Sequence, residues 1–179
     1  MAAGGATTLD WGDVQPEQDV KDCRLLGKSS HLAIDVYDNA MFVGAIDDFL
    51  YLCKSSTATG GDLLSVAAAC TKHDWAAIRK RTATAVRTHL WNTTATPSQF
   101  KPHLYFDLLP ATAGGIGLTG SPFPASFDES ALYYHGGTAQ AALAGLLTAA
   151  ELSLSLAKME ENVAAAGGKM TVGLTVRRP

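Results

Sequence analysis

The order of hydrophobic and polar positions along the 179-residue chain predicts a mainly α protein. Apolar side chains recur every three or four positions over residues 42–53, 63–72 and 75–91, which is the period of an amphipathic helix. Asp62 is a good N-cap for the second of these helices, and Asp74 opens the third. On the first helix, the predicted apolar face consists of Phe42, Ile46, Phe49 and Cys53.

The longest predicted helix runs from about Thr138 to Ala166. The glycine pair that follows it, Gly167-Gly168, is typical of a helix C-terminus. Beyond this pair, residues 169–179 alternate in the manner of an extended strand. The predicted apolar face of the helix comprises Ala139, Leu143, Leu147, Ala150, Leu154 and Ala157.

The segments between the helices carry weaker periodic signals. Residues 31–37 alternate well enough for a short strand but also fit the opening of a helix, and residues 100–109 fit either a helix or an extended segment. Residues 54–61 have the composition of a loop, and residues 111–126 form a long loop rich in Gly and Pro. A short helix is expected over residues 126–134.

Length and composition favour a single domain with one hydrophobic core. The chain is 47% hydrophobic and 17% charged, which is not the composition of a disordered protein. Residues 1–30 lack a periodic pattern and are predicted to form an extended N-terminal arm. Residues 31–163 are predicted to form the helical core, and residues 164–179 an extended C-terminal arm.

The three cysteines, Cys23, Cys53 and Cys70, are an odd number without paired spacing. This count predicts no disulfide framework and favours a reducing compartment. The first residues show neither the basic region nor the apolar run of a signal peptide. The most apolar stretch, residues 138–156, contains too many polar groups for a membrane span. A soluble, intracellular protein without a membrane partner is therefore expected.

Charge is distributed unevenly along the chain, although the formal net charge is only −3. Residues 1–48 contain nine Asp or Glu against three Lys or Arg. Residues 72–106 contain six Lys or Arg against Asp74 alone. The leading third is thus acidic and the middle is basic, and four of the cations, Arg79, Lys80, Arg81 and Arg87, lie on the single predicted helix 75–91.

Arg79 is the unusual cation of this helix. At 100° per residue it falls near the edge of the mostly apolar stripe formed by Trp75, Ile78, Thr82, Val86 and His89, whereas Lys80 and Arg87 share another side and Arg81 lies farther round. A charge near an apolar stripe is costly unless it is paired. A carboxylate, a phosphate or both would serve as its partner, and Asp107 is the candidate carboxylate.

Two interpretations of the basic helix remain open. The cations form either an ordinary solvated face or a groove in which guanidinium groups grip the phosphates of a polyanion regardless of sequence. Trp91, Tyr105 and Phe106 are near enough in sequence to stack bases, although such aromatic residues are more often part of a core.

The order of motifs in the middle of the chain resembles the coat proteins of flexuous filamentous positive-strand RNA viruses, especially potexvirus-like ones. "DFLYLCKSSTAT" is similar to the family's segment in which an aspartate and hydrophobic residues lead into a serine cluster. "AIRKRTATAVRTHLWNTTATPSQF" resembles its arginine-bearing helix with a Trp-Asn pair, and "KPHLYFDLLP" its Phe-Asp segment. "GLTGSPFPASFDESALYYHGGTAQAALA" resembles its Pro-containing linker and His-x-x-Thr helix.

The resemblance, which covers about residues 47–144, implies a structural protein of the virion and the host cytoplasm rather than an enzyme. Such subunits polymerise helically around single-stranded genomic RNA. Their N-terminal arm docks on a neighbouring copy, and their C-terminal extension lies toward the inner surface. No cofactor, metal or small-molecule substrate is expected.

The same resemblance implies an RNA groove built from a serine, an arginine and an aspartate. The serine corresponds to Ser55 or Ser56, the arginine to Arg79 or Arg81, and the aspartate to Asp107. A coat must bind any sequence, so phosphate contacts should dominate, and Lys80 and Arg87 would add to them. Asp107 would then orient the guanidinium group of Arg79.

Two other classes of function fit parts of the sequence. A self-assembling or adaptor protein that is not viral would use the same apolar, alanine-rich surface. A small glyoxalase-type metalloenzyme would use His31, with His103 or His135, as metal ligands, but the second half of its pattern is missing. Cys70 and His73 have the spacing of half a zinc site without a second pair.

Overall fold

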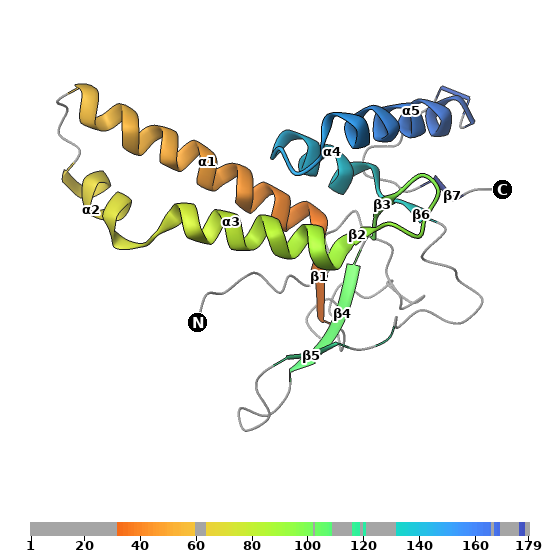
Figure 1. Cartoon of the computed structure of the whole chain (residues 1–179), viewed down its shortest axis with the longest axis horizontal. Helices are drawn as coiled ribbons and strands as arrows, with labels where there is room; N and C mark the ends of the chain where they lie inside the picture. Colours follow the sequence, from red (N-terminus) through yellow and green to blue (C-terminus); the bar gives the residue numbers. More distant parts are fainter. Residues whose placement is uncertain are drawn as a thin grey trace, which may run out of the picture.

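The structure is a computed structural model and describes only part of the chain. Within that part the protein is mainly α, as the hydrophobic pattern predicts, and short strands join the helices (Figure 1). The predicted N-terminal arm, residues 1–30, and most of residues 169–179 lie outside the described residues. The described residues are 32–59, 64–101, 103–108, 116–118, 120, 132–165, 167–168 and 176–177.

The elements follow one another in the order strand, helices, strands, helices, strand. The helices are α1 (Val36–Thr59), α2 (Leu64–Lys72), α3 (Trp75–Ala85), the π-helical turn η2 (Val86–Leu90), α4 (His135–Leu143) and α5 (Ala149–Ala165). The strands are β1 (Leu32–Asp35), β2 (Trp91–Asn92), β3 (Gln99–Phe100), β4 (His103–Leu108), β5 (Ile116–Leu118), β6 (Leu132–Tyr133) and β7 (Val176–Arg177).

Asp35 makes the transition from β1 to α1. Its carboxylate accepts a hydrogen bond of 2.7 Å from the backbone N–H of Asp38, as an N-cap does. Residues 31–37 therefore combine both predicted alternatives, a strand followed by a helix. The helix then runs on to Thr59, so the predicted loop over residues 54–61 is wrong for residues 54–59. Ser and Thr weaken a helix only slightly, and no glycine or proline interrupts this segment.

The hydrophobic core lies where α1 packs against α4 and η2. Val36, Ala40 and Val43 form the buried face of α1. Helix α4 comes close to this face because Gly137 has no side chain, and a Cβ there would clash with Val36 and Tyr134. The rest of the core cluster is Val86, Leu90, Phe100, Tyr134, Ala141, Ala144 and Leu146.

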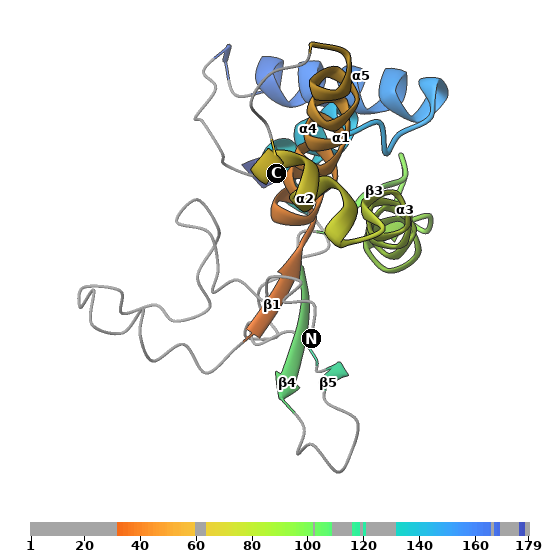
Figure 2. The ribbon, with the colours of Figure 1, turned by 90° about the vertical axis from the view of Figure 1, so that its left-hand side faces the viewer.

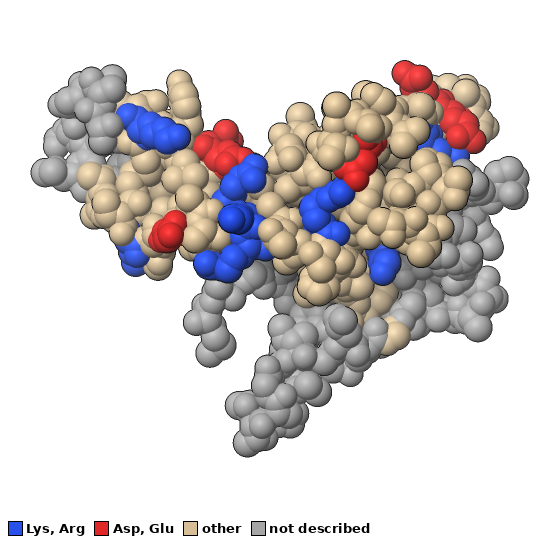
Figure 3. All heavy atoms as spheres, viewed as in Figure 1, with Lys and Arg blue, Asp and Glu red and all other residues tan. Residues whose placement is uncertain are grey.

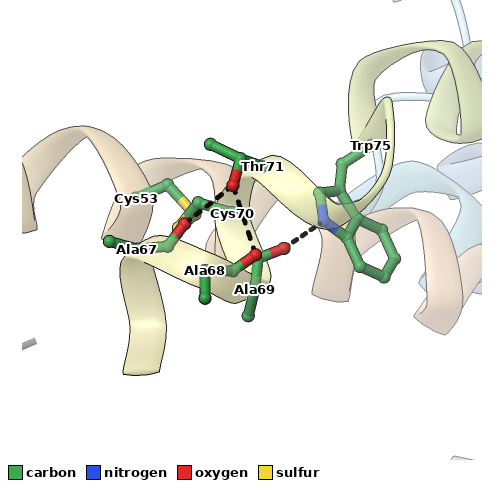
Figure 4. The surroundings of a disulfide bond; sticks show 7 residues. All are labelled: Cys53, Ala67, Ala68, Ala69, Cys70, Thr71 and Trp75. Carbon is green, nitrogen blue, oxygen red and sulfur yellow. Dashed lines mark hydrogen bonds between the residues drawn. A yellow bond between two sulfur atoms is a disulfide. The ribbon is translucent and has the colours of Figure 1, made fainter. Parts of the chain in front are cut away.

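The predicted apolar face of α1 is only partly buried: Phe42 is 43% exposed, whereas Phe49 and Cys53 face α3 and α2. Phe49 packs edge to face against Trp75, with ring centroids 5.3 Å apart. Cys53 forms a disulfide bond with Cys70 of α2, and the indole N–H of Trp75 donates to the carbonyl of Ala69 beside it (Figure 4). The expectation that the cysteines form no disulfide is therefore wrong. The odd number of cysteines did not indicate this pair, which the hairpin of α1 and α2 brings together.

Short antiparallel strands fill the middle of the chain. β4 pairs with β1 and with β5, so residues 103–108 are extended, which was one of the two predicted alternatives. β2 and β3 form a hairpin around the predicted turn, which contains the cis peptide bond Thr96–Pro97. The described strand Leu132–Tyr133 is extended where a short helix was expected, and it pairs with Val176–Arg177 of the tail.

The long C-terminal helix of the prediction is two helices. α4 ends near Ala144, Gly145 follows with a φ of 66°, and α5 begins at Ala149. Thr148 and Glu151 start α5 with a capping box: the carboxylate of Glu151 accepts from the backbone N–H of Thr148 at 2.8 Å, and the N–H of Glu151 donates to the Thr148 hydroxyl. The predicted end of α5 is confirmed.

The predicted apolar face of that helix does not form the core. Leu143 is 82% exposed and Leu154 is 55% exposed, whereas Ser155, Lys158 and Asn162 are buried about a quarter turn round α5. The helical projection misassigns both halves, because the exposed residues include Ala139, Leu143, Ala150, Leu154 and Ala157. No helix in the described part of the chain is both long and apolar enough to cross a membrane.

Candidate nucleic-acid interface

The basic helix predicted over residues 75–91 consists of α3 and the π-helical turn η2. Asp74 caps it, because its carboxylate accepts a hydrogen bond of 2.9 Å from the N–H of Ala77. The helical segment ends at Leu90, one residue before the predicted end. Turns of the π type are rare and recur at functional sites, and η2 contains Arg87, the last of the four cations.

Arg79 lies at the meeting point of three helices. Its Nε donates to Oδ1 of Asp47 at 2.8 Å, and its Nη2 donates to Oδ2 of Asp47 at 2.8 Å and to the carbonyl oxygen of Ala144 at 3.3 Å. The hydrogen bond with Asp47 raises the pKa of Arg79 above its ordinary value. The prediction that Arg79 needs a partner is confirmed, and the carboxylate that meets it is Asp47.

Arg87 is held by a different set of contacts. Its Nη2 donates to Oε1 of Glu151 at 2.6 Å, and its guanidinium carbon lies 4.5 Å from the centre of the Trp91 ring. Its Nη1 is buried and has no hydrogen-bond partner among the described residues. The guanidinium group therefore lies between an acid and an aromatic face, with the N–H groups of Nη1 unpaired there.

The hydrogen bonds that Glu151 accepts lower the pKa of its carboxyl group. Burial alone would raise the pKa of Glu151, but hydrogen bonds from the backbone of Thr148 and from Arg87 outweigh it, so the pKa lies below its ordinary value. The carboxylate thus serves two helices, because it caps α5 and pairs with η2.

Lys80 and Arg81 are the free cations of the helix. Both are exposed, and neither forms an ion pair with another described residue. Arg79 and Arg87 each have side chains that are 31% exposed. Figure 3 shows Lys and Arg atoms gathered over the middle of one face, with Asp and Glu atoms beside them and smaller basic groups on either side. The structure therefore presents a basic surface along α3.

The predicted serine of the groove lies apart from Arg79. Ser55 is half-buried in α1, and Ser56 belongs to the same helix, although its side chain lies outside the described residues. Ser55 follows Asp47 by eight positions, which is about 12 Å along a helix axis at 1.5 Å per residue. Because Asp47 holds the guanidinium group, the serine and the arginine are not brought together.

The predicted aspartate also lies in another part of the fold. Asp107 is the fifth residue of β4, where it pairs with Gly117 of β5. Figure 1 and Figure 2 both show β4 running away from the helices, so the backbone of Asp107 lies toward the remote end of the strand. Its side chain lies outside the described residues, and its pairing with Arg79 stays a prediction.

The aromatic candidates for base stacking differ in accessibility. Trp91 is half-buried and packs edge to face on Phe100, with centroids 4.8 Å apart. Tyr105 is only 5% exposed, so its ring belongs to the interior. The side chain of Phe106 lies outside the described residues. Of the three, Trp91 is the one whose position beside a cation suits a nucleic-acid contact.

The candidate metal ligands do not form a metal site in the described part of the chain. No three His, Cys, Asp or Glu side chains there are grouped closely enough to hold a metal ion. Cys70 is in the disulfide bond. His135 lies 3.1 Å from the amide of Asn162, and burial lowers its pKa. His103 lies beside Tyr105, and His31 is outside the described residues.

An apolar cavity of about 280 Å³ lies beside η2. The cavity is open to the surface between η2 and the sheet that contains β1 and β4. The residues that line it are Ile34, Asn39, Ala85, Val86, His89, Leu90 and Leu104.

Sequence reasoning missed Asp47 and Glu151, the two acids that pair with the arginines. A signal for Glu151 was present, because Thr148-x-x-Glu151 is a capping box and Gly145 precedes it. For Asp47 no local signal exists, since its partner lies 32 positions away along the chain. Comparisons with protein-family models, curated proteins and solved structures find no significant match to this chain.

Proposed function

We propose that this chain is the coat protein of a flexuous filamentous RNA virus, a helical subunit that polymerises around single-stranded RNA. The observation that carries the proposal is the basic surface along α3 and η2, where Lys80 is exposed and Arg79 and Arg87 are fixed beside it. The order of motifs over residues 47–144 supports it independently, because it resembles that of potexvirus-like coat proteins.

The chemistry of this surface suits binding that ignores sequence. Phosphate oxygens accept hydrogen bonds from Lys and Arg, and such contacts position a backbone without reading bases. Asp47 takes the orienting role expected of Asp107, because it fixes Nε and Nη2 of Arg79. Arg87 is likewise fixed by Glu151 and Trp91. Arginine groups held in place in this way lose less side-chain entropy when a phosphate binds.

The rest of the chain would serve assembly. We expect a single helical core, with residues 1–30 as an arm that docks on a neighbouring copy and residues 164–179 as an extension toward the inner surface of the filament. One or a few phosphate contacts per subunit suffice, because affinity accumulates over many linked copies.

The first experiment is to express the chain and examine it by negative-stain electron microscopy, with absorbance at 260 and 280 nm and nuclease protection on the same fraction. Flexible filaments that protect RNA support the proposal. Filaments without RNA favour a self-assembling protein that is not viral. A monomer free of nucleic acid points to an adaptor or an enzyme, and metal analysis would follow.

A matched pair of triple variants tests the basic surface itself. In Arg79→Ala/Lys80→Ala/Arg87→Ala we expect weaker RNA binding and a salt dependence, log K against log salt, that is shallower by about 2, from about 0.7 for each lost phosphate contact. Lys54→Ala/Lys72→Ala/Lys101→Ala removes three exposed cations from other elements and should bind nearly as the wild type does. Unchanged RNA binding in the first variant, with its fold intact by circular dichroism, would contradict the proposal.

A further inference from the structure

Helix α1 leaves large apolar side chains on the surface. Met41 is 49% exposed, Phe42 43%, Tyr51 70% and Leu52 57%, and they account for four of the seven exposed large hydrophobic residues in the described part of the chain. Apolar patches of this kind commonly mark a contact with another macromolecule.

One acid interrupts this apolar surface. Met41, Ala45, Asp48 and Leu52 are all exposed and follow one another by four, three and four positions, so they form one stripe along the helix. The stripe lies opposite the buried face that starts at Val36. We call these four residues the α1 outer face.

The outer side of α3 is complementary to the α1 outer face, because it carries a base among small side chains. Arg81, Thr84 and Ala85 are exposed there, and Ala77 is half-buried next to them. The surface around Arg81 therefore consists of small side chains, which leave room for bulky apolar groups. We call these four residues the α3 outer face.

The two outer faces point away from each other. Phe49 and Asp47 of α1 meet Trp75 and Arg79 of α3 in the contact between the helices, so each outer face lies on the far side of its helix. One face carries two large apolar side chains, Met41 and Leu52, with an acid between them, and the other carries small side chains with a base. Two copies related by translation and rotation can thus join unlike faces without closing a dimer.

We propose that the α1 outer face of one copy docks on the α3 outer face of the next, with Asp48 paired to Arg81. The partner is a second copy of this chain, and the argument for it is the complementarity of charge and side-chain size between the faces. This inference rests on the proposed function and deepens it. It divides the basic helix between two roles: Arg81 joins subunits, while Lys80 and Arg87, on another side, contact phosphate.

Charge reversal tests the pairing. Asp48→Arg and Arg81→Asp each place like charges together, and we expect each to raise the protein concentration needed for half-assembly by about tenfold or more, as sedimentation velocity measures it. The double variant Asp48→Arg/Arg81→Asp restores an opposite pair and should assemble near the wild-type concentration. Glu160→Arg reverses an exposed acid on α5 and should leave assembly unchanged.

An equimolar mixture of the two single variants provides a second readout. Each variant retains one unaltered face, and the two altered faces are again opposite in charge, so the mixture should form alternating assemblies. Circular dichroism establishes that each variant is folded. Single variants that assemble like the wild type, or a folded double variant that stays monomeric, would overturn the proposed contact.

Binding of a short oligouridylate, at protein concentrations below assembly, separates this inference from the proposed function. We expect Arg81→Gln to bind it less than twofold more weakly than the wild type does, and Lys80→Gln, which removes the same charge, to bind it several-fold more weakly. Equal losses in the Arg81 and Lys80 variants would overturn the division of roles. A wild-type chain that binds no RNA would instead overturn the proposed function while leaving the subunit contact testable.

Discussion

The two ends of the helical segment 75–90 are held by different means, although each carries one paired arginine. At the α3 end, Arg79 meets Asp47, whose side chain is 45% exposed, and the Cys53–Cys70 disulfide fastens the neighbouring hairpin. At the η2 end, Val86 and Leu90 are buried in the core and Arg87 meets a Glu151 that is only 20% exposed. The first end has a surface ion pair and adjoins the disulfide-linked hairpin of α1 and α2, whereas the second is held by burial.

This difference decides how much each ion pair contributes to stability. An exposed pair is screened by water and contributes little. A pair that is largely removed from water leaves an unsatisfied charge behind when one partner is lost, which costs more. The same ion-pair chemistry therefore stabilises the η2 end more than the α3 end.

Loss of the disulfide should have the largest effect. In Cys53→Ser/Cys70→Ser we expect the free energy of unfolding to fall by about 3 kcal/mol, because the bond closes a loop with a sequence separation of 17 residues. Urea unfolding measures it. The wild type under reducing conditions should match the variant, and Cys23→Ser controls for loss of a cysteine outside the bond. Equal stability of wild type and double variant would contradict the assignment.

Removal of the Glu151 charge should come next. Glu151→Gln keeps a side chain suited to the capping box but deprives Arg87 of its anion, and we expect a loss of about 2 kcal/mol. Glu160→Gln, at an exposed position on the same helix, should change the free energy of unfolding by less than about 0.5 kcal/mol. Similar losses in the two variants would show that the η2 end does not depend on its ion pair.

Acid should weaken the η2 end selectively. The pKa of Glu151 is lower in the folded chain than its ordinary value of 4.5, so the unfolded chain takes up a proton first as the pH falls. The stabilisation is complete above pH 4.5 and is lost progressively below it. Urea unfolding between pH 6 and pH 3 should therefore show a shallower decline for Glu151→Gln than for wild type. Parallel curves would argue against this role of the carboxylate.

Removal of the Asp47 charge should have the smallest effect on stability. In Asp47→Asn we expect a loss of about 0.5 kcal/mol, because the pair with Arg79 is exposed, and 0.5 M salt should reduce the difference from wild type. Asp48→Asn, one position along α1, is the matched control. A loss as large as that of Glu151→Gln would remove the contrast between the two ends.

Local patterns predicted much of the helical framework. The periodicity of residues 42–53, 63–72 and 75–91 gave helices that the structure contains, and Asp74 caps α3 as expected. The end of α1 and the break before α5 were missed. In the first case, Ser and Thr were interpreted as loop residues although they weaken a helix only slightly. In the second, Gly145 and the capping box of Thr148 and Glu151 were not recognised.

The candidate site was predictable only in part. The position of Arg79 on its helix was enough to predict that it needs a partner, because that argument uses a local period. The identity of the partner depends on how α1 and α3 pack, which no local pattern specifies. The same holds for Cys53 and Cys70, whose pairing depends on α2 folding back beside the end of α1 (Figure 1).

The disulfide also closes a covalent ring within the chain. Because Cys53 and Cys70 are joined, the backbone between them is one side of a ring, and a single cut anywhere inside it leaves both halves of the protein attached. A protease nick there would be invisible on a non-reducing gel and would appear as two fragments after reduction. The same ring offers a place to insert a foreign peptide, since both ends of the insert would stay anchored to α1 and α2.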